Sequence, residues 1–494
     1  MRAACGRSAL RLVAIALLLG SSLAPLAAAK AAGATLEVVG RQALGNRGMN
    51  AALAVAGHCA WIGSRNDAAV QVVDIANPSA PGVVGSLPAH PGSTPRELRA
   101  VPAGHLLVVL YYRLGGTGPN RFEIFHWDAD CASSTLVGTW DFGNTLPHEF
   151  YLWQDPANAR RVLLYTAMFA SATQELQVLD ITTPARPVLL GGWAVPAAYG
   201  HAPVHSVSLA PDGRTAYISL WTGGLVIADV SDFATGVAAP AVRPLTPAGG
   251  AYRTPPGNVH SAVPLDGGTR LLTSDERYPA PYGAGCPFGP AHIVDIRDPA
   301  HPVAVATLAV PENNPAACAS AVRATWTSHN PTLTAHLAFV TWYSAGLQVF
   351  QLDDLTQPVR LAELRATGVT PALRDLQLGV TDTMSWSYPI LTGGLIYLVD
   401  INQGLLVLRY TGPHQDEVAS APFVEGNSNV QEVAVATSPA AASPAPSAAG
   451  TPGFGRRVVQ TARGTSAGSL LYPVLLILVA CGAGVLVTMR RRRS

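Results

Sequence analysis

The stretch LQVLDITTPARPVLLGGW, from Leu176 to Trp193, contains a short apolar strand that ends in an Asp-Ile pair, a turn with two prolines, and a second strand. Between residues 35 and 410 a related pattern occurs in six other places, most completely in VQVVDIANPSAPGVVGSL from Val70 and AHIVDIRDPAHPVAVATL from Ala291. Asp hydrogen-bonds its own downstream backbone and Pro restricts φ, so these residues are typical of turns. We interpret them as structural rather than catalytic.

The spacing of the copies predicts an all-β fold. Asp180 and Asp229, at equivalent positions, are 49 residues apart, which is enough for four short strands. Repeats of this length built only of strands are typical of a β-propeller. We predict seven blades, with six or eight as alternatives because the copy FEIFHWDADCASSTLVGTW, from Phe122, is divergent. The last copy lacks an outer strand, and the unassigned strand from Leu36 to Arg41 is predicted to complete that blade and close the ring.

The two ends of the chain have the features of membrane signals. Arginines precede the apolar run Leu12 to Gly20, and three alanines at 27–29 form a cleavage pattern, which predicts a signal peptide over residues 1–29. The uncharged stretch Leu470 to Met489 is followed directly by four arginines. Its length and flank predict a transmembrane helix over 469–489 with the tail 490–494 in the cytoplasm, and a buried or surface-lying helix is the alternative.

The composition between these ends predicts two regions. Residues 30–411 form the expected propeller, and residues 412–468, with the run SPAAASPAPSAAGTPG, form an expected Pro/Ala/Ser-rich stalk. We therefore expect a single-pass protein of the cell membrane with an extracytoplasmic propeller. Without the seven arginines of the membrane signals, 25 basic residues face 31 acidic ones, a net charge of −6, which argues against nucleic acid as a partner.

Cysteine usage agrees with export. Cys5 and Cys481 lie in the membrane signals, and the other four cysteines lie in the expected propeller, where an oxidising compartment favours disulfides. Four cysteines allow three pairings. The blade register places two of them on each face of the ring, which predicts the pairs Cys59 with Cys131 and Cys286 with Cys318.

These repeats resemble the LVIVP repeat of bacterial exported propeller proteins over nearly all of Asn50 to Tyr410. The resemblance implies the propeller fold. It implies little about activity, because propellers carry unrelated functions.

Alignment of the first strand of every unit points to a candidate site. One residue per blade falls at the same position, and four consecutive blades offer histidine there; the seven are Asn50, Arg96, His148, His205, His260, His329 and Trp386. This strand lines the central channel, so we expect the histidines to converge at one mouth. The ends of the second strands return to that mouth with Trp221, Asp275, Glu276, Trp342 and Tyr343.

Two interpretations of the four histidines remain open. Three or four neutral imidazoles with a carboxylate suit Cu, Zn, Fe or Ni, with Glu276 as a candidate ligand or base. Alternatively, each histidine hydrogen-bonds backbone or channel water, as polar channel linings do.

A second, more remote resemblance concerns short stretches only. HSVSLAPDGRTAYISLWTGGLVIADVSD from His205 resembles the blades of selenium-binding proteins and methanethiol oxidases, as do HEF at His148 and SHN at His329. That family is linked to copper and oxidises a small thiol. The resemblance implies a metal-ligand role for His148, His205, His260 and His329.

Two classes of function follow. The architecture favours a membrane-anchored binding or scaffold module that engages an extracellular protein, a glycan or a small ligand, with a metal site at the channel mouth. The alternative is a copper-type extracytoplasmic oxidoreductase related to methanethiol oxidase.

Overall fold

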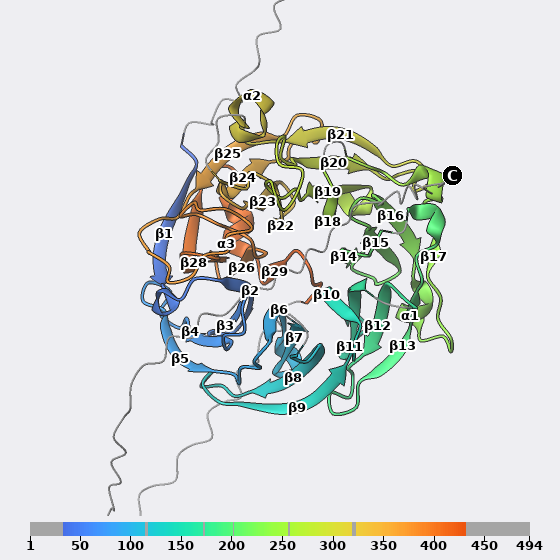
Figure 1. Ribbon diagram of the computed structural model, residues 1–494, viewed down its shortest axis with the longest axis horizontal. Coiled ribbons are helices and arrows are strands. Elements are labelled where there is room, and N and C mark those ends of the chain that lie inside the picture. The colour runs from blue at the N-terminus through green and yellow to red at the C-terminus, as the bar shows by residue number, and fades with distance from the viewer. Residues whose placement is uncertain are drawn as a thin grey trace, which may run out of the picture.

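The computed structural model describes residues 33–113, 117–170, 173–200, 202–254, 257–318 and 323–430. Six four-stranded antiparallel sheets and one five-stranded sheet stand around a central axis like the blades of a propeller (Figure 1). The all-β, seven-bladed prediction is confirmed. The expected signal peptide, the stalk beyond residue 430 and the expected membrane helix lie outside the described residues.

Each blade is a meander whose first strand lies innermost. The first blade consists of β2 (Asn50–Ala56), β3 (Cys59–Ser64), β4 (Gln71–Asp74) and β5 (Gly82–Ser86). The second consists of β6 (Ser93–Val101), β7 (Leu106–Arg113), β8 (Arg121–Trp127) and β9 (Ser134–Asp141). The third consists of β10 (Leu146–Asp155), β11 (Asn158–Ala170), β12 (Leu176–Asp180) and β13 (Val188–Trp193). The fourth blade consists of β14 (Ser206–Leu209), β15 (Thr215–Ser219), β16 (Leu225–Asp229) and β17 (Arg243–Pro244). The fifth consists of β18 (Val259–Leu265), β19 (Arg270–Asp275), β20 (Ala291–Asp295) and β21 (Val303–Leu308).

The sixth blade consists of β22 (Pro331–Leu333), β23 (Leu337–Trp342), β24 (Gly346–Gln351) and β25 (Val359–Leu364), and the seventh of β26 (Ile390–Thr392), β27 (Leu395–Asp400), β28 (Gly404–Thr411) and β1 (Thr35–Gln42). Three short helices lie between or after blades: α1 (Ser231–Thr235), α2 (Pro315–Cys318) and α3 (Gln415–Ser420). Buried apolar side chains fill the spaces between neighbouring blades.

The N-terminal strand closes the ring as predicted. β1 pairs with β28 in antiparallel register from Thr35 opposite Thr411 to Gln42 opposite Leu405. The N-terminal strand thus completes the last blade, and backbone hydrogen bonds within that one sheet join the two ends of the propeller.

A glycine and a proline turn recur where neighbouring blades meet. In six blades the outermost strand carries a β-bulge. A Cβ on Gly40 would lie 2.0 Å from the Pro78 carbonyl oxygen of the next blade, and one on Gly138 would lie 1.8 Å from that of Pro184. The repeated Asp-Ile-x-x-Pro turn therefore packs against a backbone that has no side chain in the way.

The C-terminal boundary of the propeller differs from the prediction. Residues 412–430, expected to begin the stalk, instead form α3, which contacts β26, β27 and β28, and β29 (Val424–Glu425), which pairs with β26. Figure 1 shows β29 near the centre of the ring. Asn427 and Asn429 then hydrogen-bond the backbone of Leu152 in the third blade. The folded region extends to residue 430, and this polar segment lacks the alternation that would have revealed its strand.

Both predicted disulfides are present. Cys59 and Cys131 link the first two blades with Cα atoms 5.4 Å apart, and Cys286 and Cys318 are bonded with Cα atoms 5.9 Å apart. Within the described residues, no helix is long and apolar enough to cross a membrane.

Ring closure can be tested at Gly40. We expect Gly40→Ala to lower the free energy of unfolding by about 1–3 kcal/mol, because the new methyl group would overlap the Pro78 carbonyl. Gly82→Ala is the matched control, since it lies in an outer strand with open space at its Cβ. Thermal unfolding of both variants gives the comparison, and equal stability would contradict the packing described for the junction.

Candidate functional site

Irregular backbone positions the four histidines. His148 and His260 occupy β-bulges in the innermost strands β10 and β18, and Arg96 occupies the equivalent bulge in β6. His205 and His329 come just before β14 and β22, where their backbone N–H groups donate to the neighbouring strands. A bulge adds one residue and redirects its side chain, so several blades can turn an extra side chain into the channel mouth.

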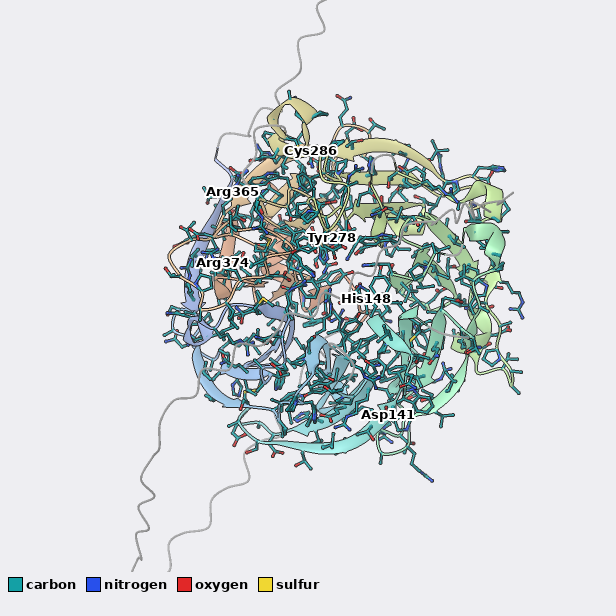
Figure 2. All side chains as sticks on the ribbon, in the orientation of Figure 1. Asp141, His148, Tyr278, Cys286, Arg365 and Arg374 are labelled. Carbon is teal, nitrogen blue, oxygen red and sulfur yellow. A yellow bond between two sulfur atoms is a disulfide. The ribbon has the colours of Figure 1, made fainter. Side chains whose placement is uncertain are left out.

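The structure brings all four predicted histidines together. The Nε2 atoms of His148 and His205 are 3.1 Å apart. The ring centroids of His205 and His260 are 4.3 Å apart, and those of His260 and His329 are 3.9 Å apart. Figure 2 shows His148 close to the central axis of the ring. The register of four consecutive blades thus produces an arc of adjoining imidazoles, whose planes are tilted by 44–66° from one ring to the next.

Glu276 supplies a carboxylate to this arc. Its Oε2 atom is 3.7 Å from His205 Nε2, and its Oε1 atom is 3.5 Å from His329 Nε2. The hydroxyl of Tyr343 donates to Oε1. Ligand atoms of His205, His260 and Glu276 lie within 4.8 Å of one another, close enough to share one ion after small movements.

Hydrogen bonds outside the arc orient two of the rings. His329 Nδ1 donates to the carbonyl of Trp386 at 2.8 Å. The hydroxyl of Ser261 donates to Asn330, so its oxygen can accept from His260 Nδ1, which is 2.5 Å away. In these neutral tautomers the lone pair is on Nε2. Outer partners of this kind commonly orient metal-binding histidines.

Burial keeps the imidazoles neutral. The four rings belong to residues that are 1–6% exposed, and burial lowers the pKa of each well below its usual value. The positive charge of Arg96 lowers the four pKa values further. Neutral imidazole is the form that binds metal ions, so the site does not have to release protons first.

Aromatic and charged side chains surround the arc. Trp221 stacks on His205 with ring centroids 4.4 Å apart. The guanidinium groups of Arg65 and Arg96 lie 5.3 Å and 5.4 Å from the ring centroid of Trp386. Arg65 also forms an ion pair with Asp375, at 2.7 Å, whereas Arg96 has no ion pair with the residues that the structure describes. Of the mouth residues expected from the sequence, Arg96, Trp221, Tyr343 and Trp386 therefore do contact the site.

Three expected mouth residues have structural partners instead. Asn50 donates to the carbonyls of Asp400 and Ile401, which joins blades one and seven. Asp275 contacts Thr254 and His292 within its own blade. The indole N–H of Trp342 donates to the Trp326 carbonyl. Alternation along each strand explains the difference, because neighbouring residues such as Asp275 and Glu276 point to different sides.

A second polar layer, which sequence reasoning missed, lies beneath the histidines. Tyr388 donates to Glu149 at 3.2 Å, and Arg99 forms ion pairs with Glu97 at 3.2 Å and Glu425 at 3.5 Å. Burial raises the pKa of Glu425 to about 7 and raises that of Glu149 well above its usual value. The signal was present in Glu97 and Glu149, which directly follow the aligned Arg96 and His148.

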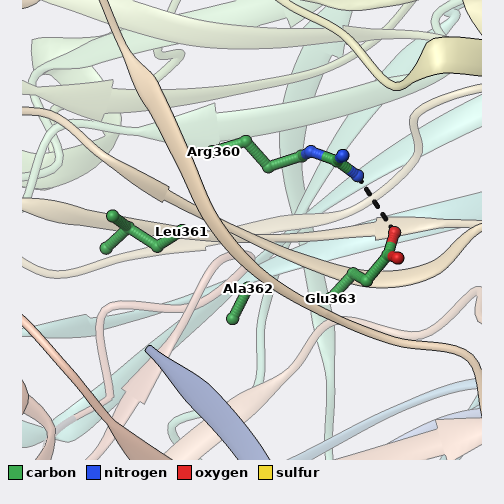
Figure 3. A pocket seen from close by; sticks show the side chains of 4 residues that line it. All are labelled: Arg360, Leu361, Ala362 and Glu363. Atoms are coloured by element: carbon green, nitrogen blue, oxygen red, sulfur yellow. Dashed lines mark hydrogen bonds and ion pairs between the residues drawn. The ribbon is translucent and has the colours of Figure 1, made fainter. Parts of the chain in front are cut away.

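Other clusters and hollows do not belong to this site. His58 lies beside Cys59 and Cys131, but these cysteines are already joined in a disulfide and cannot act as thiolate ligands. A shallow pocket in the sixth blade is lined by residues of the outermost strand β25, far from the innermost strands that carry the histidines (Figure 3); its residues are Arg360, Leu361, Ala362 and Glu363.

The neutral histidines make stability depend on pH. The unfolded chain takes up a proton at each histidine near pH 6.5, whereas the folded site resists it, so each ring costs up to about 1.4 kcal/mol per pH unit below 6.5. We expect His205→Gln to weaken this loss of stability in metal-free protein, measured by denaturant unfolding between pH 5 and pH 7.5. The exposed His126 provides the control: His126→Gln should keep the wild-type dependence. Identical pH dependence in all three proteins would contradict burial of neutral His205.

Sequence comparison identifies the repeats. The LVIVD repeat family matches residues 47–88 and 205–235, in the first and fourth blades. No curated protein matches the chain.

Solved propeller structures are similar at low identity. The periplasmic gluconolactonase PpgL of Pseudomonas aeruginosa is 14% identical, with 77% of this chain and 96% of that chain covered and a TM-score of 0.49. Sqt1 from Chaetomium thermophilum is 12% identical over 75% and 97% of the two chains, with a TM-score of 0.47. A protein from Lactobacillus plantarum is 14% identical over 64% and 86%, with a TM-score of 0.44. Similarities at this level carry no argument about activity.

The repeat expected from the sequence under the description LVIVP is thus matched in these two stretches by the LVIVD repeat. With the sheet order described above, the chain is a seven-bladed β-propeller in which two stretches match the LVIVD repeat.

Proposed function

We propose that this propeller binds one transition-metal ion in the arc formed by His148, His205, His260 and His329, with Glu276 as a carboxylate ligand or base. The observation that carries the proposal is that the Nε2 atoms of His205 and His329 both approach the Glu276 carboxylate. In addition, the Nδ1 atoms of His260 and His329 are hydrogen-bonded to groups outside the arc. Imidazole donors with one carboxylate suit Cu, Zn, Fe or Ni.

An unpartnered polar atom supports a cation at this place. Among the described residues, Oε2 of Glu276, which faces His205 Nε2, is buried without a hydrogen-bond partner. A buried polar atom without a partner costs about 1–3 kcal/mol. Glu276 also carries a carboxylate among neutral rings, and a bound cation would compensate its charge. The residues present therefore fit a metal ion.

The proposal includes the expected position of the propeller outside a membrane. Two disulfides are typical of an exported domain, and the uncharged stretch at 470–489 supports an anchor. A binding module on such a stalk would offer the channel mouth to small ligands, and the metal ion gives that binding role a specific form.

Metal content tests the site directly. We expect the purified full-length protein to contain one more Cu, Zn, Fe or Ni ion per chain than His205→Ala, because His205 contacts both its histidine neighbours and Glu276. Elemental mass spectrometry measures the difference, and His126→Ala, on an exposed ring, should keep the wild-type content. Equal metal content in wild type and His205→Ala after reconstitution would contradict the proposal.

We infer an oxidoreductase acting on small thiols as the second candidate. The remote resemblance to methanethiol oxidases supports it, and so do two oxidisable side chains in contact with the arc, Trp221 on His205 and Tyr343 on Glu276. A redox-active metal such as copper would supply the electron-transfer chemistry. Glu276 lies where it could take the proton of a thiol that enters the mouth.

Thiol consumption separates this candidate from a metal site without activity. We expect the copper-loaded protein to consume methanethiol in air, and Glu276→Gln to reduce the rate by about 10²-fold or more through loss of the base. Metal content is measured on the same samples, so a variant that merely loses copper is recognised. A copper-loaded wild type without thiol consumption would exclude the activity and leave the metal site intact.

A further inference from the structure

A second histidine cluster lies at the other end of the propeller. His336 is in the turn between β22 and β23, and His414 and Glu417 lie after β28, at the start of the C-terminal extension. Because first strands run away from the four-histidine mouth, this turn is on the opposite face. The side chains of His336, His414 and Glu417 are 49%, 27% and 17% exposed, so water and ions can reach them.

The nitrogen atoms of this cluster point at one carboxylate. The two imidazole rings are stacked with centroids 4.6 Å apart and planes 17° apart. His336 Nδ1 is hydrogen-bonded to Glu417 Oε1, and His414 Nδ1 is 3.8 Å from the same oxygen. The three ligand atoms all lie within 4.8 Å of one another. Ligands of a tetrahedral zinc ion are about 3.3 Å apart, so only small shifts are needed.

Asp353 completes the arrangement from outside. Its Oδ1 atom is 2.7 Å from His414 Nε2, which places the ring proton on Nε2 and the lone pair on the nitrogen that faces Glu417. A carboxylate behind a histidine is the usual second contact of zinc-binding histidines. Glu417 is held as well, because its Oε2 atom accepts from the backbone N–H of His336 at 3.0 Å.

We propose that His336, His414 and Glu417 form a surface site for a zinc-like divalent ion, with Asp353 orienting His414. Two imidazoles and one carboxylate are the donor set of many zinc sites, and exposure leaves a position for water. The site is separate from the channel arc and does not rest on its function.

Such an ion would fasten the C-terminal extension to the sixth blade. One ligand comes from the turn at residues 334–336 and two come from residues 414–417, so the ion would join segments that are otherwise held by side-chain contacts. The extension continues into β29 and the residues that bond Leu152 across the channel. Zinc would therefore also restrain the segment that crosses the channel.

Titration of the full-length protein with Zn²⁺ alone tests the site. By calorimetry we expect His414→Ala and His336→Ala to bind one Zn²⁺ fewer than wild type or to bind it at least tenfold more weakly, and Asp353→Asn to weaken it about tenfold. His301→Ala is the matched control, because His301 also forms an exposed pair with a carboxylate, at 2.9 Å, but belongs to no group of three ligands within the described part of the chain.

Hydrogen exchange measures whether Zn²⁺ joins the C-terminal extension to the sixth blade. Zn²⁺ should slow amide exchange of residues 412–430 in wild type and not in His414→Ala. Unchanged binding in both histidine variants, or an equal loss in His301→Ala, would overturn the proposal. His205→Ala reports on the channel ion alone, so failure of either site is recognised independently of the other.

Discussion

Pairing of β1 with β28 is the interaction on which the other arrangements depend. Without it the seventh blade would lack its outer strand, and no backbone hydrogen bonds would join the two ends of the propeller. The arc of histidines spans blades three to six, while Arg96 and Trp386 reach it from blades two and seven. Those residues meet because the circle is complete. The close approach of Gly40 to the first proline turn shows how tightly the junction is packed.

The channel concentrates groups that proteins usually keep apart. Four imidazoles, Glu276 and a lower layer with Glu97, Glu149 and Glu425 are all buried. Bulges in the inner strands make this possible, because they turn extra side chains inward without breaking the blade. Burial favours the neutral forms of the four histidines and raises the pKa values of Glu97, Glu149 and Glu425. Burying so many polar groups together costs stability, which is common at functional sites.

The C-terminal extension connects the two ends of the molecule. Its helix contributes Glu417 to the surface cluster, and β29 contributes Glu425 to the layer below the histidines. The two histidine clusters also differ in environment. The imidazole rings of the channel arc are buried from solvent, whereas the side chains of His336 and His414 are partly exposed to it. Different metal affinities are expected from that contrast, because solvent competes for the exposed donors.

Blade number, ring closure, both disulfides and the meeting of four histidines followed from the amino-acid sequence, because strand alternation and proline turns are local and a repeat carries its register from blade to blade. The sequence could not separate Glu276 from Asp275, or Tyr343 from Trp342, since neighbours at a strand end point to different sides and only the folded structure decides which of the two faces the channel. Nor could it place Tyr388, Glu425 or the pair His336 and His414. Those contacts join positions that share no repeat, and only the packing of the extension against the closed ring brings them together.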